Sequence, residues 1–140
     1  MAAAYSVFPR DGVYIEPRTY TKVTQEVDGV EKVLLDNTGT EGEVVLSNET
    51  TYYMNEMLKK VVSSGTGTAA RISGMTVAGK TGSTTANNDR WFVGYTPYYT
   101  AAVWVGYKTP ERIRANNNPA AVMWQKDMSP VHQGLSNKGF

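Results

Sequence analysis

Two apolar segments in the second half of the chain constrain its fold most strongly. Residues 91–95 and 99–107 are apolar on both faces of a pleated strand, and Thr96-Pro97 supplies a turn between them. A strand without a polar face needs cover on both sides. The two segments therefore predict central strands of a sheet that is sandwiched by helices.

The N-terminal half predicts short elements separated by turns. Residues 2–8 are typical of the end of a small-residue helix, which Pro9 stops. Residues 19–27 and 30–35 are rich in Thr, Val and Tyr or Leu, and Asp28-Gly29 joins them. This pattern predicts a β-hairpin.

Two longer helices complete the prediction. Ser47 or Asn48 can cap the first helix, and Gly65 can end it. Asn118 caps the second helix, with Pro119 at its first position. The core-facing positions that we expect are Met54, Met57, Leu58, Val61 and Val62 in the first helix, and Ala121, Trp124 and Met128 in the second. Strands and helices in this order predict an α+β fold, an antiparallel sheet flanked by helices.

Composition narrows the functional classes. The chain has 140 residues, of which 41% are hydrophobic and 19% charged, with a formal net charge of +1, no Cys and a single His. A low net charge without basic blocks disfavours nucleic acid as a partner. We expect no metal site and no cofactor, and we expect His132 to lie on the surface or in a loop. Without an apolar run of about 18 residues, the chain as printed is expected to be soluble.

One segment matches two unrelated motifs. Residues 74–81 fit the phosphate-loop pattern G-x-x-x-x-G-K-[ST]. That loop needs a flexible nest and a helix that begins at the Lys-Thr pair. Here residues 75–78 have the apolar, β-branched character of a strand, and residues 82–89 favour turns. A P-loop NTPase is therefore the less favoured alternative.

Interpreted as a strand that ends in Lys80-Thr81-Gly82-Ser83, the segment resembles the third signature of penicillin-binding proteins and serine β-lactamases. Its surroundings resemble class A penicillin-binding proteins in order and spacing: residues 65–67, 77–84, 91–97 and 103–107. The resemblance covers nearly the whole chain. It implies that residues 1–140 form the C-terminal portion of one transpeptidase domain, with a partial penicillin-binding-protein/serine β-lactamase-like fold.

The resemblance also implies roles for four residues in binding a peptidoglycan stem peptide or a β-lactam. The hydroxyls of Thr81 and Ser83, on one face of the strand, would hold a terminal carboxylate. Lys80 would supply positive potential, and Gly82 would keep the opposite face free of bulk. The backbone N–H of Ser83 would be one of two oxyanion-hole donors.

The other two signatures of this family are absent from the sequence. No Ser is followed by Lys three positions later, and no Ser-x-Asn triplet occurs. We expect the nucleophile on a missing N-terminal part of the domain, an inactive fragment, and a parent serine-type D-Ala-D-Ala transpeptidase at the extracytoplasmic face of the bacterial cell membrane. The alternative is a non-catalytic packing or assembly module. In either case the exposed sheet face favours self-association.

Several other residues receive structural interpretations. Asp89 lies in a predicted turn, where a carboxylate commonly caps backbone groups. Trp91, Tyr95 and Tyr107 lack interleaved basic residues, so we assign them to the sheet core rather than to a base-stacking platform.

Overall fold

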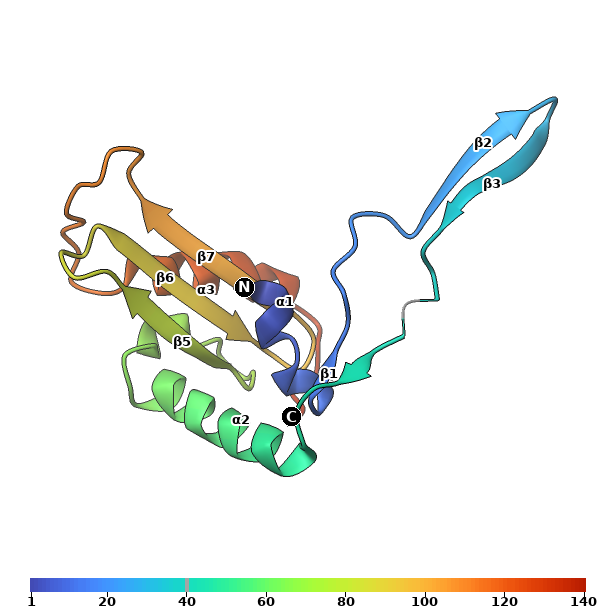
Figure 1. Cartoon of the computed structure of the whole chain (residues 1–140). Coiled ribbons are helices and arrows are strands. Elements are labelled where there is room, and N and C mark those ends of the chain that lie inside the picture. Colours follow the sequence, from blue (N-terminus) through green and yellow to red (C-terminus); the bar gives the residue numbers. More distant parts are fainter. Residues whose placement is uncertain (40) are drawn as a thin grey trace.

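The computed structural model describes residues 1–39 and 41–140. A body of one sheet and several helices carries a β-hairpin that projects away from it (Figure 1). The body comprises α1 (Ala2–Tyr5), η1 (Phe8–Arg10), α2 (Asn48–Ser63), η2 (Thr68–Ala70), β5 (Ala78–Ser83), β6 (Asp89–Tyr95), β7 (Thr100–Gly106) and α3 (Pro119–Val131). The projecting arm comprises β1 (Val13–Tyr14), β2 (Lys22–Val27), β3 (Val30–Asp36) and β4 (Glu43–Val44).

The body sheet is antiparallel with the order β5-β6-β7. This arrangement confirms the α+β fold class. The prediction that residues 99–107 form a central strand is wrong, because β7 is an edge of this sheet and the Trp104 side chain is 47% exposed. Tyr107 was also misassigned to the core, since it lies beyond β7 and is exposed. Among the strands of the described residues, only β6 has paired strands on both sides.

Helix α2 begins where the capping pattern predicts. The Ser47 side chain accepts a hydrogen bond from the Thr50 backbone N–H at 3.2 Å. Its buried face differs from the predicted stripe, because Met57 is 56% exposed. The buried positions follow i, i+4, i+7 and i+11 instead: Thr51, Asn55, Leu58 and Val62.

Helix α3 covers one face of the sheet, behind it in Figure 1. The Asn118 side chain accepts hydrogen bonds from the N–H groups of Ala120 and Ala121, and Pro119 occupies the first turn. Trp124 is fully buried and meets Phe92 of β6 edge to face, with ring centroids 5.3 Å apart. These contacts confirm the predicted α3 face and fix the sheet to the helix.

Tyr95 organises the other end of β6. It is fully buried, and its ring stacks on Phe8 at 6.0 Å between centroids. Its hydroxyl donates to Asn55 Oδ1 at 2.6 Å, and Asn55 Nδ2 donates to the Phe8 carbonyl at 3.1 Å. Burial raises the pKa of Tyr95 above its usual range, and nearby Tyr5 adds to the rise. This network ties α2, β6 and η1 together.

The N-terminal segment only partly follows its prediction. The helix α1 is shorter than residues 2–8, and Pro9 lies inside the 3-10 turn η1 rather than after a helix. The α1 helix lies in front of the sheet in Figure 1 and contacts β6 and β7. Both faces of the sheet therefore carry helical cover, although α1 covers only one end.

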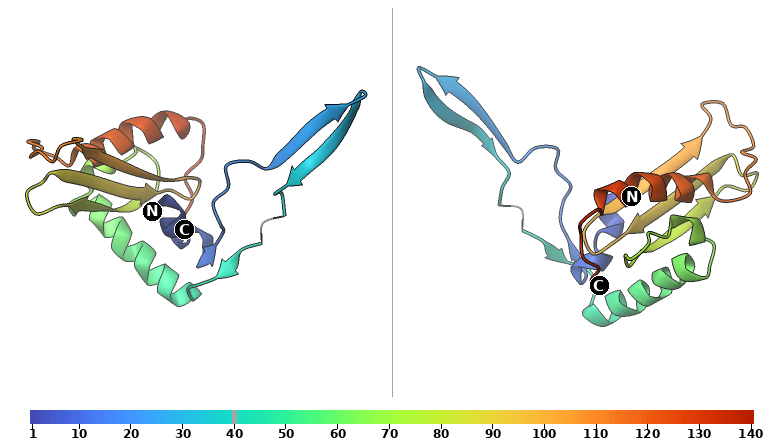
Figure 2. Two further views of the ribbon diagram at one scale, coloured as in Figure 1. Left: turned by 45° about the horizontal axis from the view of Figure 1, so that its top comes forward. Right: turned by 180° about the vertical axis from the view of Figure 1, so that it is seen from behind.

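The predicted hairpin forms with its turn at Asp28-Gly29. Both turn residues have positive φ, 52° and 74°, as a tight two-residue turn requires. The side chains of β3 are all exposed, and the β2–β3 hairpin stands clear of the body in both views of Figure 2. Apolar side chains are therefore left in solvent along this arm.

His132 is the clearest error of the sequence interpretation. It is 5% exposed and ends α3 as its C-cap. Its two ring nitrogens lie 2.7 Å from the Thr96 hydroxyl oxygen and 2.7 Å from the Met128 carbonyl oxygen. The expected surface position is thus wrong, although the residue does lie in a turn, directly after α3, and it links α3 to the β6–β7 turn.

The Tyr95 network yields a stability prediction. Tyr95→Phe leaves Asn55 Oδ1 buried without its donor, so we expect the free energy of unfolding to fall by about 1–3 kcal/mol at pH 7. Urea unfolding followed by circular dichroism measures the change. Tyr107→Phe, at an exposed ring, is the matched control and should change stability by less than about 0.5 kcal/mol. Equal effects of the two variants would contradict this account.

The raised pKa of Tyr95 adds a pH dependence. A group with a raised folded-state pKa stabilises the fold fully below its unfolded value and loses that contribution as pH rises above it. Wild-type stability should therefore fall as pH passes about 10. Tyr95→Phe should show a shallower fall over the same range. An unchanged slope in the variant would show that other groups carry the dependence.

Candidate functional site

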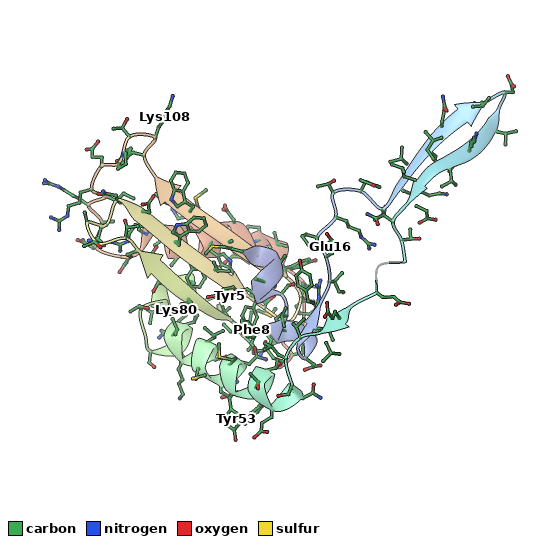
Figure 3. All side chains as sticks on the ribbon, viewed as in Figure 1. Tyr5, Phe8, Glu16, Tyr53, Lys80 and Lys108 are labelled. Atoms are coloured by element: carbon green, nitrogen blue, oxygen red, sulfur yellow. The ribbon has the colours of Figure 1, made fainter. Side chains whose placement is uncertain are left out.

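The Lys80-Thr81-Gly82-Ser83 sequence lies within β5, as predicted. Antiparallel pairing with β6 sets Lys80 opposite Val93, Thr81 opposite Phe92 and Ser83 opposite Arg90. The other side of β5 has no paired strand among the described residues. Lys80 projects from the strand close to α2 in Figure 3. The four residues thus form one free edge of the sheet.

The turn after β5 determines which backbone groups face that free edge. The Thr84 N–H donates to the Asp89 carbonyl at 3.2 Å, across the hairpin toward β6. Successive N–H groups of an extended strand point to opposite sides. The N–H of Ser83 and the carbonyl of Thr81 therefore point to the free edge.

The Lys80 side chain lies along the same edge. Its Nζ donates to the Thr81 carbonyl at 2.9 Å, and the residue is exposed. A cation, a carbonyl and the Ser83 N–H consequently share the unpaired side of the strand. The expectation that Lys80 lies outside the core agrees with this position.

Thr81 and Ser83 share one face of the sheet with Arg90. The Thr81 and Thr66 hydroxyls lie 2.7 Å apart. Within the described chain the Ser83 hydroxyl has no hydrogen-bond partner. A surface hollow of about 390 Å³ adjoins these groups, lined by Gly65, Thr66, Thr68, Ala69, Thr81, Ser83, Arg90, Asn116, Asn117 and Asn118.

The loop after α2 brings Thr66 to the strand. The Gly65 N–H donates to the Lys60 and Val61 carbonyls, and a Cβ at Gly65 would come within 2.9 Å of Val61. Gly67 donates to the Val61 carbonyl as well. Glycines at these positions allow the loop to pass close to the end of α2, and this path directs Thr66 toward Thr81.

Two glycines in β5 permit close packing beneath the site. A Cβ at Gly79 would lie 2.6 Å from Phe92 Cζ, so the strand could not keep this register with a larger residue. A Cβ at Gly82 would lie 3.2 Å from Trp91 Cβ, a tight contact on the face opposite the hydroxyls. A side chain at position 82 would therefore crowd Trp91.

Sequence interpretation missed several residues around the hollow. Thr66 lies in the segment 65–67 that carries part of the family resemblance, but no sequence pattern assigns a site role to Thr66 or to Arg90. The register of a hairpin closed at residues 84–89 would have paired Arg90 with Ser83. Asn116 and Asn117 approach from a loop far along the sequence, and no local pattern places them there.

Asp89 opens β6 and accepts a hydrogen bond from Trp104 Nε1 at 3.0 Å. This contact agrees with a structural role. Trp91 lies 6.4 Å from Trp104 between ring centroids and is half-buried. Within residues 1–39 and 41–140, no group of three His, Asp or Glu side chains is placed to hold a metal ion.

The phosphate-loop alternative fails on geometry. Lys80 and Thr81 lie inside β5, and no helix begins at this pair. A phosphate nest requires the helix N-terminus that is missing here. The NTPase interpretation is therefore wrong.

Comparison with known proteins identifies relatives for nearly all of the chain. Residues 1–121 match the family model described as the penicillin binding protein transpeptidase domain. Penicillin-binding protein 1A of Clostridium acetobutylicum is 45% identical over 139 residues, which are 99% of this chain and 17% of that protein. Penicillin-binding protein 1A/1B of Bacillus subtilis is 41% identical over 120 residues, or 76% of this chain and 13% of that protein. The chain thus spans under a fifth of these two relatives.

Solved structures share the fold. The D,D-transpeptidase domain of a peptidoglycan glycosyltransferase from Eggerthella lenta superposes with a TM-score of 0.71 at 29% identity, over 96% of this chain and 32% of that chain. Penicillin-binding protein 1A from Haemophilus influenzae has a TM-score of 0.77 at 17% identity, over 99% of this chain and 27% of that chain. These matches support the transpeptidase prediction, and they favour neither the NTPase nor the assembly-module alternative.

Proposed function

Because this chain belongs to the penicillin-binding protein transpeptidase family, we propose that it supplies one wall of a D,D-transpeptidase acyl-transfer site. The wall is the free edge and one face of β5. The observation that carries the proposal is the convergence of two hydroxyls, a cation and an outward N–H on four consecutive residues.

The hydroxyls of Thr81 and Ser83 bind the terminal carboxylate of a stem peptide, or the equivalent carboxylate of a β-lactam. They lie on the same face and adjoin a hollow that Thr66 also lines. A hydroxyl that donates to a carboxylate makes a charge-assisted hydrogen bond, stronger than a neutral one. Thr66 holds the Thr81 hydroxyl in place for this contact.

The Ser83 N–H acts as an oxyanion-hole donor. It points away from β6, so the sheet leaves it unused. A preorganised donor of this kind contributes about 2.7–4 kcal/mol to lowering the barrier of acyl transfer. Lys80 adds positive potential on the same edge, where its Nζ lies beside the Thr81 carbonyl.

The nucleophile comes from outside the printed residues. The 140 residues contain neither Ser-x-x-Lys nor Ser-x-Asn, and the relatives are several times longer. We assign the attacking serine to the N-terminal part of the transpeptidase domain, which would dock against β5. The enzyme is then a serine-type D-Ala-D-Ala transpeptidase, and these residues alone are inactive.

Location and association follow as further parts of this proposal. The parent works at the extracytoplasmic face of the bacterial cell membrane, where its peptidoglycan substrate lies. No helix in residues 1–39 and 41–140 has the length and apolar character needed to cross a membrane. Alone, the chain would self-associate through the sheet surface around exposed Trp104 on β7, an edge strand whose outer side has no partner strand among the described residues.

The first test uses the 140 residues as printed. Incubated with a fluorescent penicillin, they should form no covalent adduct, because Ser83 has no general base beside it and its hydroxyl binds the carboxylate. Intact-mass spectrometry measures the outcome. The positive control is a longer protein that includes the N-terminal part of the domain. A stoichiometric adduct on any serine of this chain would refute the assignment of the nucleophile elsewhere.

The second test uses that longer protein. Lys80→Ala should slow acylation by a β-lactam at least about tenfold, or about 1.4 kcal/mol, while the fold persists because Lys80 is exposed. Stopped-flow fluorescence gives the rate. Lys126→Ala, on α3, is the matched control and should acylate at the wild-type rate. A wild-type rate for Lys80→Ala would contradict the role of this cation.

A further inference from the structure

A backbone hydrogen bond fastens the loop between β7 and α3 to the β5–β6 turn. The Ile113 N–H donates to the Asn87 carbonyl at 3.0 Å. Asn87 has φ of 57°, a left-handed conformation that Asn tolerates, and its own N–H donates to the Thr84 carbonyl at 2.8 Å. Arg112 and Arg114 flank the anchored residue and are therefore held beside this turn.

A third guanidinium reaches the same place from β6. Arg90 Nη1 donates to Asn87 Oδ1 at 2.9 Å. The three arginines line a surface hollow of about 680 Å³, together with Asn87, Ile113, Ala115 and Asn116. In the part of the chain that the structure describes, the ion pairs are Lys22 with Glu31 and Lys59 with Glu56. None of the three guanidinium groups has a carboxylate partner there.

Arg90 also has an unsatisfied buried donor. Its Nε is buried and has no hydrogen-bond acceptor. A buried donor without an acceptor costs free energy, and donors of this kind are rare in folded proteins. The planar guanidinium suits a carboxylate that accepts from two N–H groups at once. An oxyanion in the hollow would balance the positive charge of the three guanidinium groups that line it.

We propose that Arg90, Arg112 and Arg114 form a second anion site, which binds a carboxylate of an acidic peptide. This hollow and the hollow beside Thr81 share two lining residues, Arg90 and Asn116. A peptide whose terminal carboxylate meets Thr81 could therefore place another carboxylate among the arginines. The choice of a peptide ligand rests on the proposed function, whereas the anion site itself does not.

Nuclear magnetic resonance of the 140-residue chain tests the site directly. The probe is N-acetylglutamate, and the Arg90 Nε–Hε signal is the readout, since a carboxylate bound beside this guanidinium should change the chemical shifts of its N–H groups. We expect a saturable shift that N-acetylglutamine amide, the uncharged analogue, does not cause. Arg112→Gln and Arg114→Gln should each weaken binding, raising the dissociation constant about tenfold.

Three controls separate this site from its alternatives. Lys108→Gln removes the same charge near the start of the same loop (Figure 3) and should change affinity less than about twofold. Thr81→Val should leave binding intact, so failure of the proposed function would not remove this signal. An unmoved Arg90 signal, or an equal loss in Lys108→Gln, would overturn the site. Binding of inorganic phosphate as tight as that of the peptide carboxylate would overturn the ligand assignment.

Discussion

Along β5, the backbone N–H and C=O groups of successive residues point to opposite sides of the strand, and the candidate site depends on this constraint. One side of β5 pairs with β6. The hydrogen bond from the Thr84 N–H to the Asp89 carbonyl fixes which residues of β5 direct their backbone groups toward β6. The Ser83 N–H is thereby left without a partner in β6, as the proposed oxyanion-hole role requires. A one-residue slip would exchange the outward and inward groups and also move both hydroxyls to the other face. Register is therefore as important to function as residue identity.

The core around β6 protects that register. Phe92 lies under Gly79 and against Trp124, so its ring locks the strand pair to α3 at a point where no Cβ fits. At the other end Tyr95 is held through Asn55 to η1. Both anchors lie on the strand next to the motif. The buried residues thus stabilise the geometry of an exposed edge.

Sequence reasoning recovered what local chemistry determines. The caps at Ser47 and Asn118, the Asp28-Gly29 turn and the strand character of the motif each depend on a few neighbouring residues. It failed where contacts with residues distant in the sequence determine which side chains are buried. The apolar pattern placed Met57 in the core and gave no core position to Asn55, which is buried because the Tyr95 hydroxyl donates a hydrogen bond to it. Likewise His132 is buried because Thr96 and Met128 satisfy its ring. The arginine hollow depends on the contact of two distant loops, which no periodicity reveals.

The most direct test of the central claim is a crystal structure of a longer protein containing this chain, acylated by a β-lactam. The account predicts carboxylate oxygens within about 3.2 Å of Thr81 Oγ1 and Ser83 Oγ, and the acyl carbonyl oxygen at a similar distance from the Ser83 nitrogen. A carboxylate bound away from both hydroxyls, or a Ser83 N–H paired with another strand, would contradict it.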